Sequence, residues 1–98
     1  MKKTALITGA SSGIGLEFAE IFAKTGNNVI LVARSGDKLN EIKKHLTETY
    51  GNFNCCFIKD LSKPNAAKEL FDEVTASGLE VDYLINNAGY ITEGSIEN

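Results

Sequence analysis

The sequence of 98 residues has no long hydrophobic run and no cluster of basic residues. Its longest uninterrupted apolar stretch, Val29 to Ala33, is far shorter than the roughly 20 residues that span a bilayer. The opening Met1-Lys2-Lys3 leads into a strand-like run, not into a signal-peptide core. We therefore expect a cytoplasmic chain with no membrane partner. A net charge of −3 without clustered Lys or Arg argues against a nucleic-acid partner.

Cysteine and histidine are scarce. The two cysteines, Cys55 and Cys56, are adjacent in a strand-like run, where neighbouring side chains point to opposite faces and a bridge between them would be strained. We interpret both as small buried or half-buried hydrophobic residues. The single histidine, His45, is expected on the surface of a helix. No metal site is predicted.

Strand-like and helix-like patterns alternate along the chain. Strands are predicted over residues 4–8, 28–33, 53–59 and 81–86, with three helices between them. This βαβαβαβ order predicts one α/β domain over residues 1–98, a Rossmann-type, three-layer fold with a parallel sheet.

Finer features of the helices also follow from the pattern. The first helix is predicted to bury an apolar stripe formed by Ile14, Phe18, Ile21 and Phe22. Glycines suited to the left-handed position after a helix are Gly26, Gly51 and Gly78. Candidate residues for helix N-caps and first turns are Ser35, Ser62 and Pro64.

A glycine-rich segment joins the first predicted strand to the first predicted helix. It reads Thr8-Gly9-Ala10-Ser11-Ser12-Gly13-Ile14-Gly15. Glycine permits positive φ and close approach of a ligand to the backbone, and a helix N-terminus presents unpaired N–H groups with the positive end of the helix dipole. The context favours a nucleotide phosphate at this turn. The alternative is a purely structural strand-to-helix turn.

Two further motifs accompany the glycines: Asp60-Leu61 after the third predicted strand and Asn86-Asn87-Ala88-Gly89 at the end of the fourth. Together with the G-x-x-x-G-x-G spacing, they resemble the motifs of the short-chain dehydrogenase/reductase family. The resemblance covers essentially the whole chain and implies the strand order 3-2-1-4. It also implies a cofactor crevice where that order reverses, between the first and fourth strands.

The resemblance also implies roles for single residues. The residues around the cofactor phosphates would be Gly9, Ser11, Ser12, Gly13, Ile14 and Gly15. Asp60 would bond the adenine amino group, with the Leu61 backbone beside it. Backbone contacts with the cofactor ribose would come from Asn87, Ala88 and Gly89, and the asparagine amides would stabilise the sheet. The structural alternatives are a carboxylate at a helix N-terminus near Ser62 and a simple turn after the fourth strand.

The residue after the second predicted strand bears on the choice of dinucleotide. NAD sites usually place Asp or Glu there to accept hydrogen bonds from the ribose 2′-hydroxyl, whereas this chain has Arg34. A guanidinium cannot accept a hydrogen bond but suits a phosphate, so we expect NADP, with NAD as the less favoured alternative. Lys38 would add positive charge. Asp37 fits the first turn of the second helix, and a solvated loop arginine is the alternative for Arg34.

Catalytic residues of the family are missing from this sequence. The resemblance implies a serine and a Tyr-x-x-x-Lys pair, in which the tyrosine exchanges a proton with the carbonyl or alcohol oxygen. None of Tyr50, Tyr83 and Tyr90 is followed by Lys four residues later. We therefore expect a truncated chain that carries the cofactor-binding half of an NADP(H)-dependent oxidoreductase, with no catalytic residue of its own. The alternatives are a non-catalytic nucleotide-binding module and a self-associating truncated fragment.

The fourth predicted strand is expected to leave an open edge. Val81, Leu84 and Ile85 would expose apolar surface there, because the third helix alone covers one face of the sheet. We expect this edge to meet either another copy of the chain or the missing C-terminal half of the enzyme.

Overall fold

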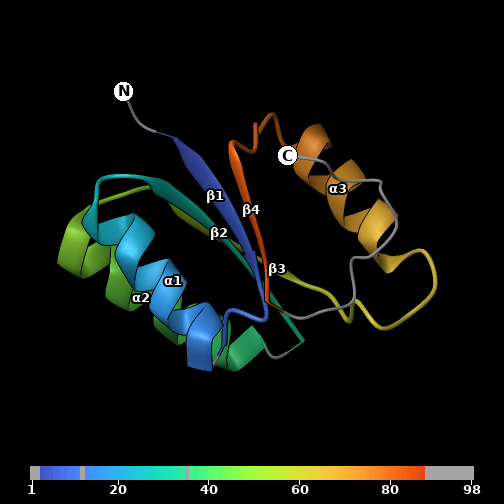
Figure 1. Cartoon of the computed structure of the whole chain (residues 1–98), viewed down its shortest axis with the longest axis horizontal. Coiled ribbons are helices and arrows are strands. Elements are labelled where there is room, and N and C mark those ends of the chain that lie inside the picture. The colour runs from blue at the N-terminus through green and yellow to red at the C-terminus, as the bar shows by residue number, and fades with distance from the viewer. Residues whose placement is uncertain (1–2, 12, 35, 88–98) are drawn as a thin grey trace.

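The computed structural model describes residues 3–11, 13–34 and 36–87. Strands and helices alternate as the sequence predicts (Figure 1). The elements are β1 (Thr4–Thr8), α1 (Gly13–Lys24), β2 (Asn28–Ala33), α2 (Gly36–Tyr50), β3 (Asn54–Ile58), α3 (Ala66–Ala76) and β4 (Tyr83–Asn86). The bounds of β1 and β2 agree with the prediction, whereas β3 and β4 are shorter than predicted.

All strand pairings are parallel, and the order β3-β2-β1-β4 confirms the expected Rossmann-type sheet. Helices α1 and α2 cover one face and α3 covers the other (Figure 1). Thr8 is level with Val32 of β2 and with Asn86 of β4. The carboxyl ends of the strands therefore meet at one edge of the sheet.

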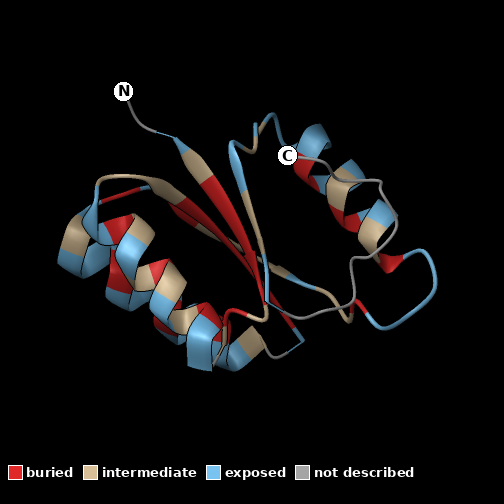
Figure 2. Ribbon diagram, viewed as in Figure 1, coloured by how far each residue is buried: buried red, intermediate tan, exposed pale blue. Residues whose placement is uncertain are grey.

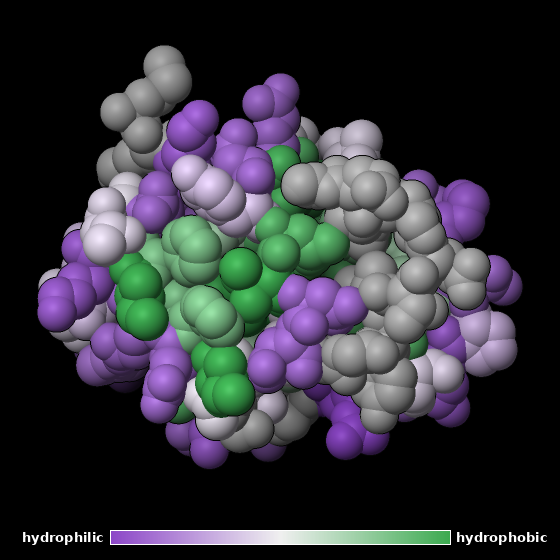
Figure 3. All heavy atoms as spheres, viewed as in Figure 1, coloured by the Kyte–Doolittle hydropathy of each residue, from purple (hydrophilic) through white to green (hydrophobic). Residues whose placement is uncertain are grey.

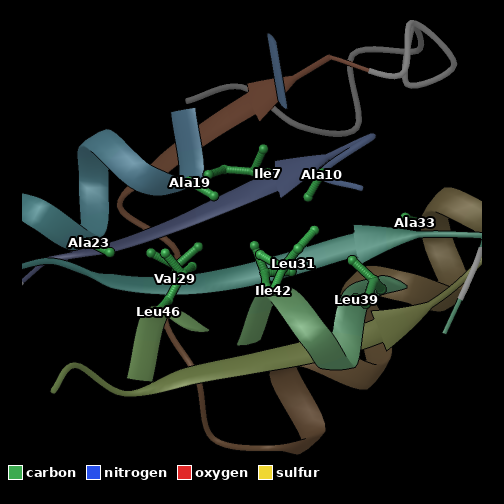
Figure 4. Packing of buried hydrophobic residues seen from close by; sticks show 10 residues of the cluster. All are labelled: Ile7, Ala10, Ala19, Ala23, Val29, Leu31, Ala33, Leu39, Ile42 and Leu46. Carbon is green, nitrogen blue, oxygen red and sulfur yellow. The ribbon is translucent and has the colours of Figure 1, made fainter. Parts of the chain in front are cut away.

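Two hydrophobic clusters hold the three layers together. The cluster under α1 and α2 is drawn in Figure 4 and is formed by Ile7, Ala10, Ala19, Ala23, Val29, Leu31, Ala33, Leu39, Ile42 and Leu46. The cluster under α3 is formed by Leu6, Ile30, Val32, Leu61, Ala66, Leu70 and Val74. Buried residues run along β1 and β2, while the outer strands β3 and β4 are mostly half-buried or exposed (Figure 2).

The prediction for the buried face of α1 was partly correct. Phe18 and Phe22 are half-buried and pack against the cluster under α1 and α2. The fully buried residues of the helix are the small ones, Gly15, Ala19 and Ala23. Ile14 and Ile21 are 62% and 55% exposed, and apolar surface gathers over α1 and β4 in Figure 3. Small side chains allow the helix backbone to lie close to the sheet, so the larger residues are displaced to the flanks of the contact.

Predicted helix ends were partly correct. Gly26, Gly51 and Gly78 have φ of +92°, +74° and +79°, which confirms the left-handed position after each helix. Ser62 does not cap α3, because the helix begins at Ala66 and its N-cap, Asn65, makes no side-chain capping bond. Ser62 and Pro64 lie instead in the turns that precede α3. The candidate cap Ser35 lies outside the described residues.

The remaining surface predictions concern the cysteines and β4. Cys55 and Cys56 are half-buried and pack against opposite clusters, as the alternation predicts, and burial raises the pKa of both thiols. Val81, Leu84 and Ile85 are half-buried, not fully exposed, because they pack against the clusters on either face. Within the described ranges, no helix is long and apolar enough to cross a membrane.

Candidate functional site

The glycine-rich segment forms the centre of the candidate site, at the carboxyl end of β1 and the start of α1. Gly9 and Gly13 have φ of +63° and +57°, in the region that side chains disfavour. A Cβ on Gly13 would meet no atom within 4 Å, so the space beside this glycine is open. The N–H of Ala10 donates to the Val32 carbonyl at 3.1 Å and ties the segment to β2.

Gly15 has a different role from Gly13, and the sequence alone did not separate them. Gly15 is buried, and a Cβ built there would collide with the Gly9 carbonyl oxygen and come within 2.8 Å of Asn87 Nδ2. Glycine is therefore needed at position 13 for its positive φ, and the space beside it is open. At position 15 glycine is needed because α1 packs closely against the turn. Ser11 is half-buried, and Ser12 lies outside the described residues.

Side chains at the ends of β1 and β4 lock these strands together. Asn87 Nδ2 donates to the Gly9 carbonyl at 3.2 Å, and the fully buried Thr8 hydroxyl donates to Asn86 Oδ1 at 3.1 Å. Both contacts hold the end of β4 against the glycine-rich segment. Sequence analysis gave Thr8 no role, although a hydroxyl at the end of an otherwise apolar strand was a usable signal. Ala88 and Gly89 lie outside the described residues.

Arg34 follows the last residue of β2 and is exposed. Within residues 3–11, 13–34 and 36–87, no carboxylate lies within 4 Å of its guanidinium. Lys38 and Asp37 are both exposed in the first turn of α2, the position predicted for Asp37. Because Arg34 has no ion-pair partner in this part of the chain, its donors are available to an anion at the carboxyl edge of the sheet.

Asp60 lies two residues after β3 ends. Its Oδ1 accepts hydrogen bonds from the Ser62 hydroxyl at 2.6 Å and from the Ser62 N–H at 3.0 Å. These two bonds hold the pKa of Asp60 below its usual value; burial opposes them, and the positive charges of Arg34 and Lys63 add to the lowering. Asp60 is therefore an ionised acceptor that forms a local turn, and the influence of Arg34 shows that the two groups share one region. The Leu61 side chain is buried under α3, so only its backbone can serve a ligand.

Neither described tyrosine lies at this edge. Tyr83 begins β4, at the amino edge of the sheet, and its ring contacts Phe22 with centroids 5.5 Å apart. Tyr50 ends α2, and its hydroxyl donates to Glu20 Oε1 of α1 at 2.7 Å. The predicted surface position of His45 is confirmed, with Nε2 2.8 Å from Glu20 Oε2. The described part of the site therefore contains no tyrosine suited to proton transfer.

Comparison with known proteins identifies relatives over most of the chain. The model of the family described as short chain dehydrogenase matches residues 3–98. A fatty acyl-CoA reductase of Acinetobacter baylyi is 48% identical over 87 residues, which are 89% of this chain and 29% of that protein. A very-long-chain 3-oxoacyl-CoA reductase of Anas platyrhynchos is 36% identical over 87% of this chain and 27% of its own length. The chain thus spans little more than a quarter of these relatives.

Solved structures share the fold. L-sorbose reductase from Gluconobacter frateurii, complexed with NADPH and L-sorbose, superposes with a TM-score of 0.84 at 42% identity over 90% of this chain and 34% of that chain. A short-chain dehydrogenase from Sphingobium yanoikuyae in complex with NADPH gives a TM-score of 0.69 at 36% identity, over 74% of this chain and 28% of that chain. The likeness therefore extends to sequence as well as to architecture.

Proposed function

The chain belongs to the short-chain dehydrogenase family, and from that premise we propose that it is the cofactor-binding part of an NADP(H)-dependent oxidoreductase. The reaction class is hydride transfer between the nicotinamide and a carbonyl or alcohol group, and the bound dinucleotide supplies the hydride. In this proposal the chain binds and orients the cofactor, while acid–base residues come from outside these 98 residues.

The observation that carries this proposal is the space at the N-terminus of α1. Gly13 has positive φ, and a Cβ added to it would meet nothing within 4 Å, while Gly15 lets the helix approach the Gly9 carbonyl and Asn87. A pyrophosphate at this position would meet the free N–H groups and the positive end of the helix dipole. In this arrangement Ser11 and Ile14 flank the phosphates, and Asn87 fixes the wall formed by the end of β4.

Arg34 supports NADP over NAD. Its guanidinium is exposed at the end of β2 and has no carboxylate partner within the described ranges, so it is free to hold the 2′-phosphate. Asp60 and the Leu61 backbone would then lie beside the adenine. Solved relatives in complex with NADPH point to the same class of cofactor.

Calorimetric titration of Arg34→Ala with NADP⁺ and NAD⁺ tests the choice of cofactor. Loss of charge-assisted hydrogen bonds worth about 1.5–3 kcal/mol should weaken NADP⁺ roughly ten- to 150-fold and should change NAD⁺ much less. Lys38→Ala is the matched control, because Lys38 is also exposed near this edge and should cause a smaller loss. Salt must be held constant, since screening weakens exposed phosphate contacts. Equal losses for both dinucleotides would make Arg34 irrelevant to the 2′-phosphate.

A non-catalytic nucleotide-binding module is the second candidate. It is favoured by one observation: no tyrosine in the sequence is followed four residues later by lysine. Both candidates predict dinucleotide binding by this chain, and they differ in whether the gene product also carries the tyrosine and lysine. The intact mass of the native protein separates them, because a longer product with a Tyr-x-x-x-Lys motif supports the oxidoreductase.

A further inference from the structure

The Asp60 carboxylate uses only one of its two oxygens within the described part of the chain. Its Oδ1 accepts hydrogen bonds from the Ser62 hydroxyl at 2.6 Å and from the Ser62 N–H at 3.0 Å. Among residues 3–11, 13–34 and 36–87, no donor bonds Oδ2 and no cation lies within 4 Å of it. An ionised carboxylate accepts several hydrogen bonds at once, and Asp60 is only half-buried. Oδ2 is therefore left for a donor from a ligand.

The backbone on both sides of this carboxylate is fixed. The Lys59 N–H donates to the Ala33 carbonyl of β2 at 2.9 Å, and the Lys63 N–H donates to the Asp60 carbonyl at 3.1 Å. Leu61 is buried and packs under α3. The sheet therefore holds the backbone before Asp60, and a turn holds the backbone after it. The freedom that this leaves to the carboxylate is rotation about its own side-chain bonds.

Ser62 restricts that rotation. A bond from the N–H two residues along the chain is the usual way in which an aspartate forms a local turn, and the Ser62 hydroxyl adds a second donor to the same oxygen. The Ser62 side chain is exposed, so its hydroxyl does not serve the packing of the core. These bonds are also the main reason why the pKa of Asp60 is lowered. Ser62 therefore both orients the carboxylate and favours its ionised form.

We propose that Ser62 is a positioning residue of the cofactor site, which holds the Asp60 carboxylate so that Oδ2 accepts a hydrogen bond from the adenine amino group. This inference rests on the function proposed above, in which Asp60 lies beside the adenine. Ser62 does not touch the cofactor in this arrangement, and its whole effect passes through Asp60. The result is selectivity, because a fixed carboxylate attracts an amino group at C6 of the purine and repels an oxygen at the same position.

Calorimetric titration with two dinucleotides tests this selectivity. The probes are NADP⁺ and its hypoxanthine analogue, in which an oxygen replaces the adenine amino group. Ser62→Ala should weaken NADP⁺ roughly three- to tenfold, the effect of one hydrogen bond, and should change the analogue much less. Ser62→Thr keeps the hydroxyl and should retain the preference of the unaltered chain. In an Asp60→Ala chain the preference should be lost, and adding Ser62→Ala should have no further effect.

A measurement without ligand separates this inference from the proposed function. The Asp60 carboxyl carbon, followed by NMR from neutral to acidic pH, should titrate at a higher pH in Ser62→Ala than in the unaltered chain or in Ser62→Thr, because the hydroxyl no longer stabilises the ionised form.

Three results would overturn the inference alone. They are an unchanged Asp60 titration in Ser62→Ala, an unchanged preference for NADP⁺ over the analogue, and equal losses of both dinucleotides, which would mean that Ser62 only shapes the turn. Binding of neither dinucleotide by the unaltered chain would instead contradict the proposed function, and the inference would fail with it.

Discussion

Replacing Gly15 by alanine should destabilise the fold, because the structure leaves no room for one methyl group. The new Cβ would collide with the Gly9 carbonyl and lie 2.8 Å from Asn87 Nδ2. The Gly9 clash involves backbone, so it cannot be relieved by rotating a side chain. Either α1 moves away from the turn or the turn moves away from α1, and in both cases the Asn87–Gly9 hydrogen bond at 3.2 Å is disturbed.

The magnitude follows from these contacts. Overpacking costs about 1–3 kcal/mol, and losing the hydrogen bond adds about 1 kcal/mol. Alanine recovers about 0.5–1 kcal/mol through its better helix propensity. The net loss for Gly15→Ala is therefore roughly 2 kcal/mol. Gly13→Ala is the matched control, since its Cβ meets no other atom. Its cost is the left-handed backbone conformation alone, about 1–2 kcal/mol. The lower conformational entropy of the unfolded variant offsets about 0.4–1 kcal/mol of that cost.

Urea denaturation of the two variants and the unaltered chain measures the difference. The NMR signals of the Asn87 side-chain amide should shift in Gly15→Ala and stay in place in Gly13→Ala. A third variant, Gly13→Val, separates packing from ligand binding. It should keep the contact between Asn87 and Gly9 but abolish dinucleotide binding, because its side chain fills the open space beside Gly13. A Gly15→Ala chain as stable as the original, with an unshifted Asn87 amide, would refute the reasoning.

Three further outcomes are expected. The isolated chain should show no NADPH-dependent turnover of carbonyl compounds above background in a spectrophotometric assay, and turnover by a preparation free of longer enzyme would contradict this. Asn52→Ala should lower the free energy of unfolding by about 1–3 kcal/mol, because the buried amide donates to the Ala23 and Asn27 carbonyls at 2.6 and 2.7 Å. An unchanged denaturation midpoint would show that these two hydrogen bonds do not stabilise the fold. The Tyr50 hydroxyl lowers the pKa of Glu20, so the stability due to this contact should be present above pH 4.5, the usual pKa, and be lost as the pH falls through the lowered pKa. Denaturation midpoints measured over a range of acidic pH should therefore fall less steeply for Glu20→Gln than for the unaltered chain. An equally steep fall in the variant would exclude Glu20 as the cause.

Local patterns in the sequence were sufficient for the order and type of the elements. β1 and β2 are continuous apolar runs between turn residues, which is typical of strands buried on both faces, and their bounds were predicted to the residue. The left-handed glycines after the helices were equally predictable, because φ preference is a property of the residue itself. The alternation of strands and helices then limits the topology, since parallel crossovers are right-handed.

The face that each element buries depended on neighbours distant in the sequence. The apolar pattern of α1 pointed to Ile14 and Ile21, but the close approach of the helix to the sheet placed Gly15, Ala19 and Ala23 in the contact. The start of α3 was also missed, because Ser62 bonds the Asp60 carboxylate and the chain turns again before the helix begins.

The candidate site divides in the same way. The sequence by itself determined which residues are available, since the glycine spacing and the placement of Arg34 and Asp60 after strands can be read locally. Only the tertiary structure decided that Asn87 donates to Gly9, a contact between residues 78 positions apart. It also decided that Gly13 faces open space while Gly15 faces backbone. Such distinctions depend on distances between separate strands and helices, and these distances are fixed only when the sheet pairs and the helices pack on it.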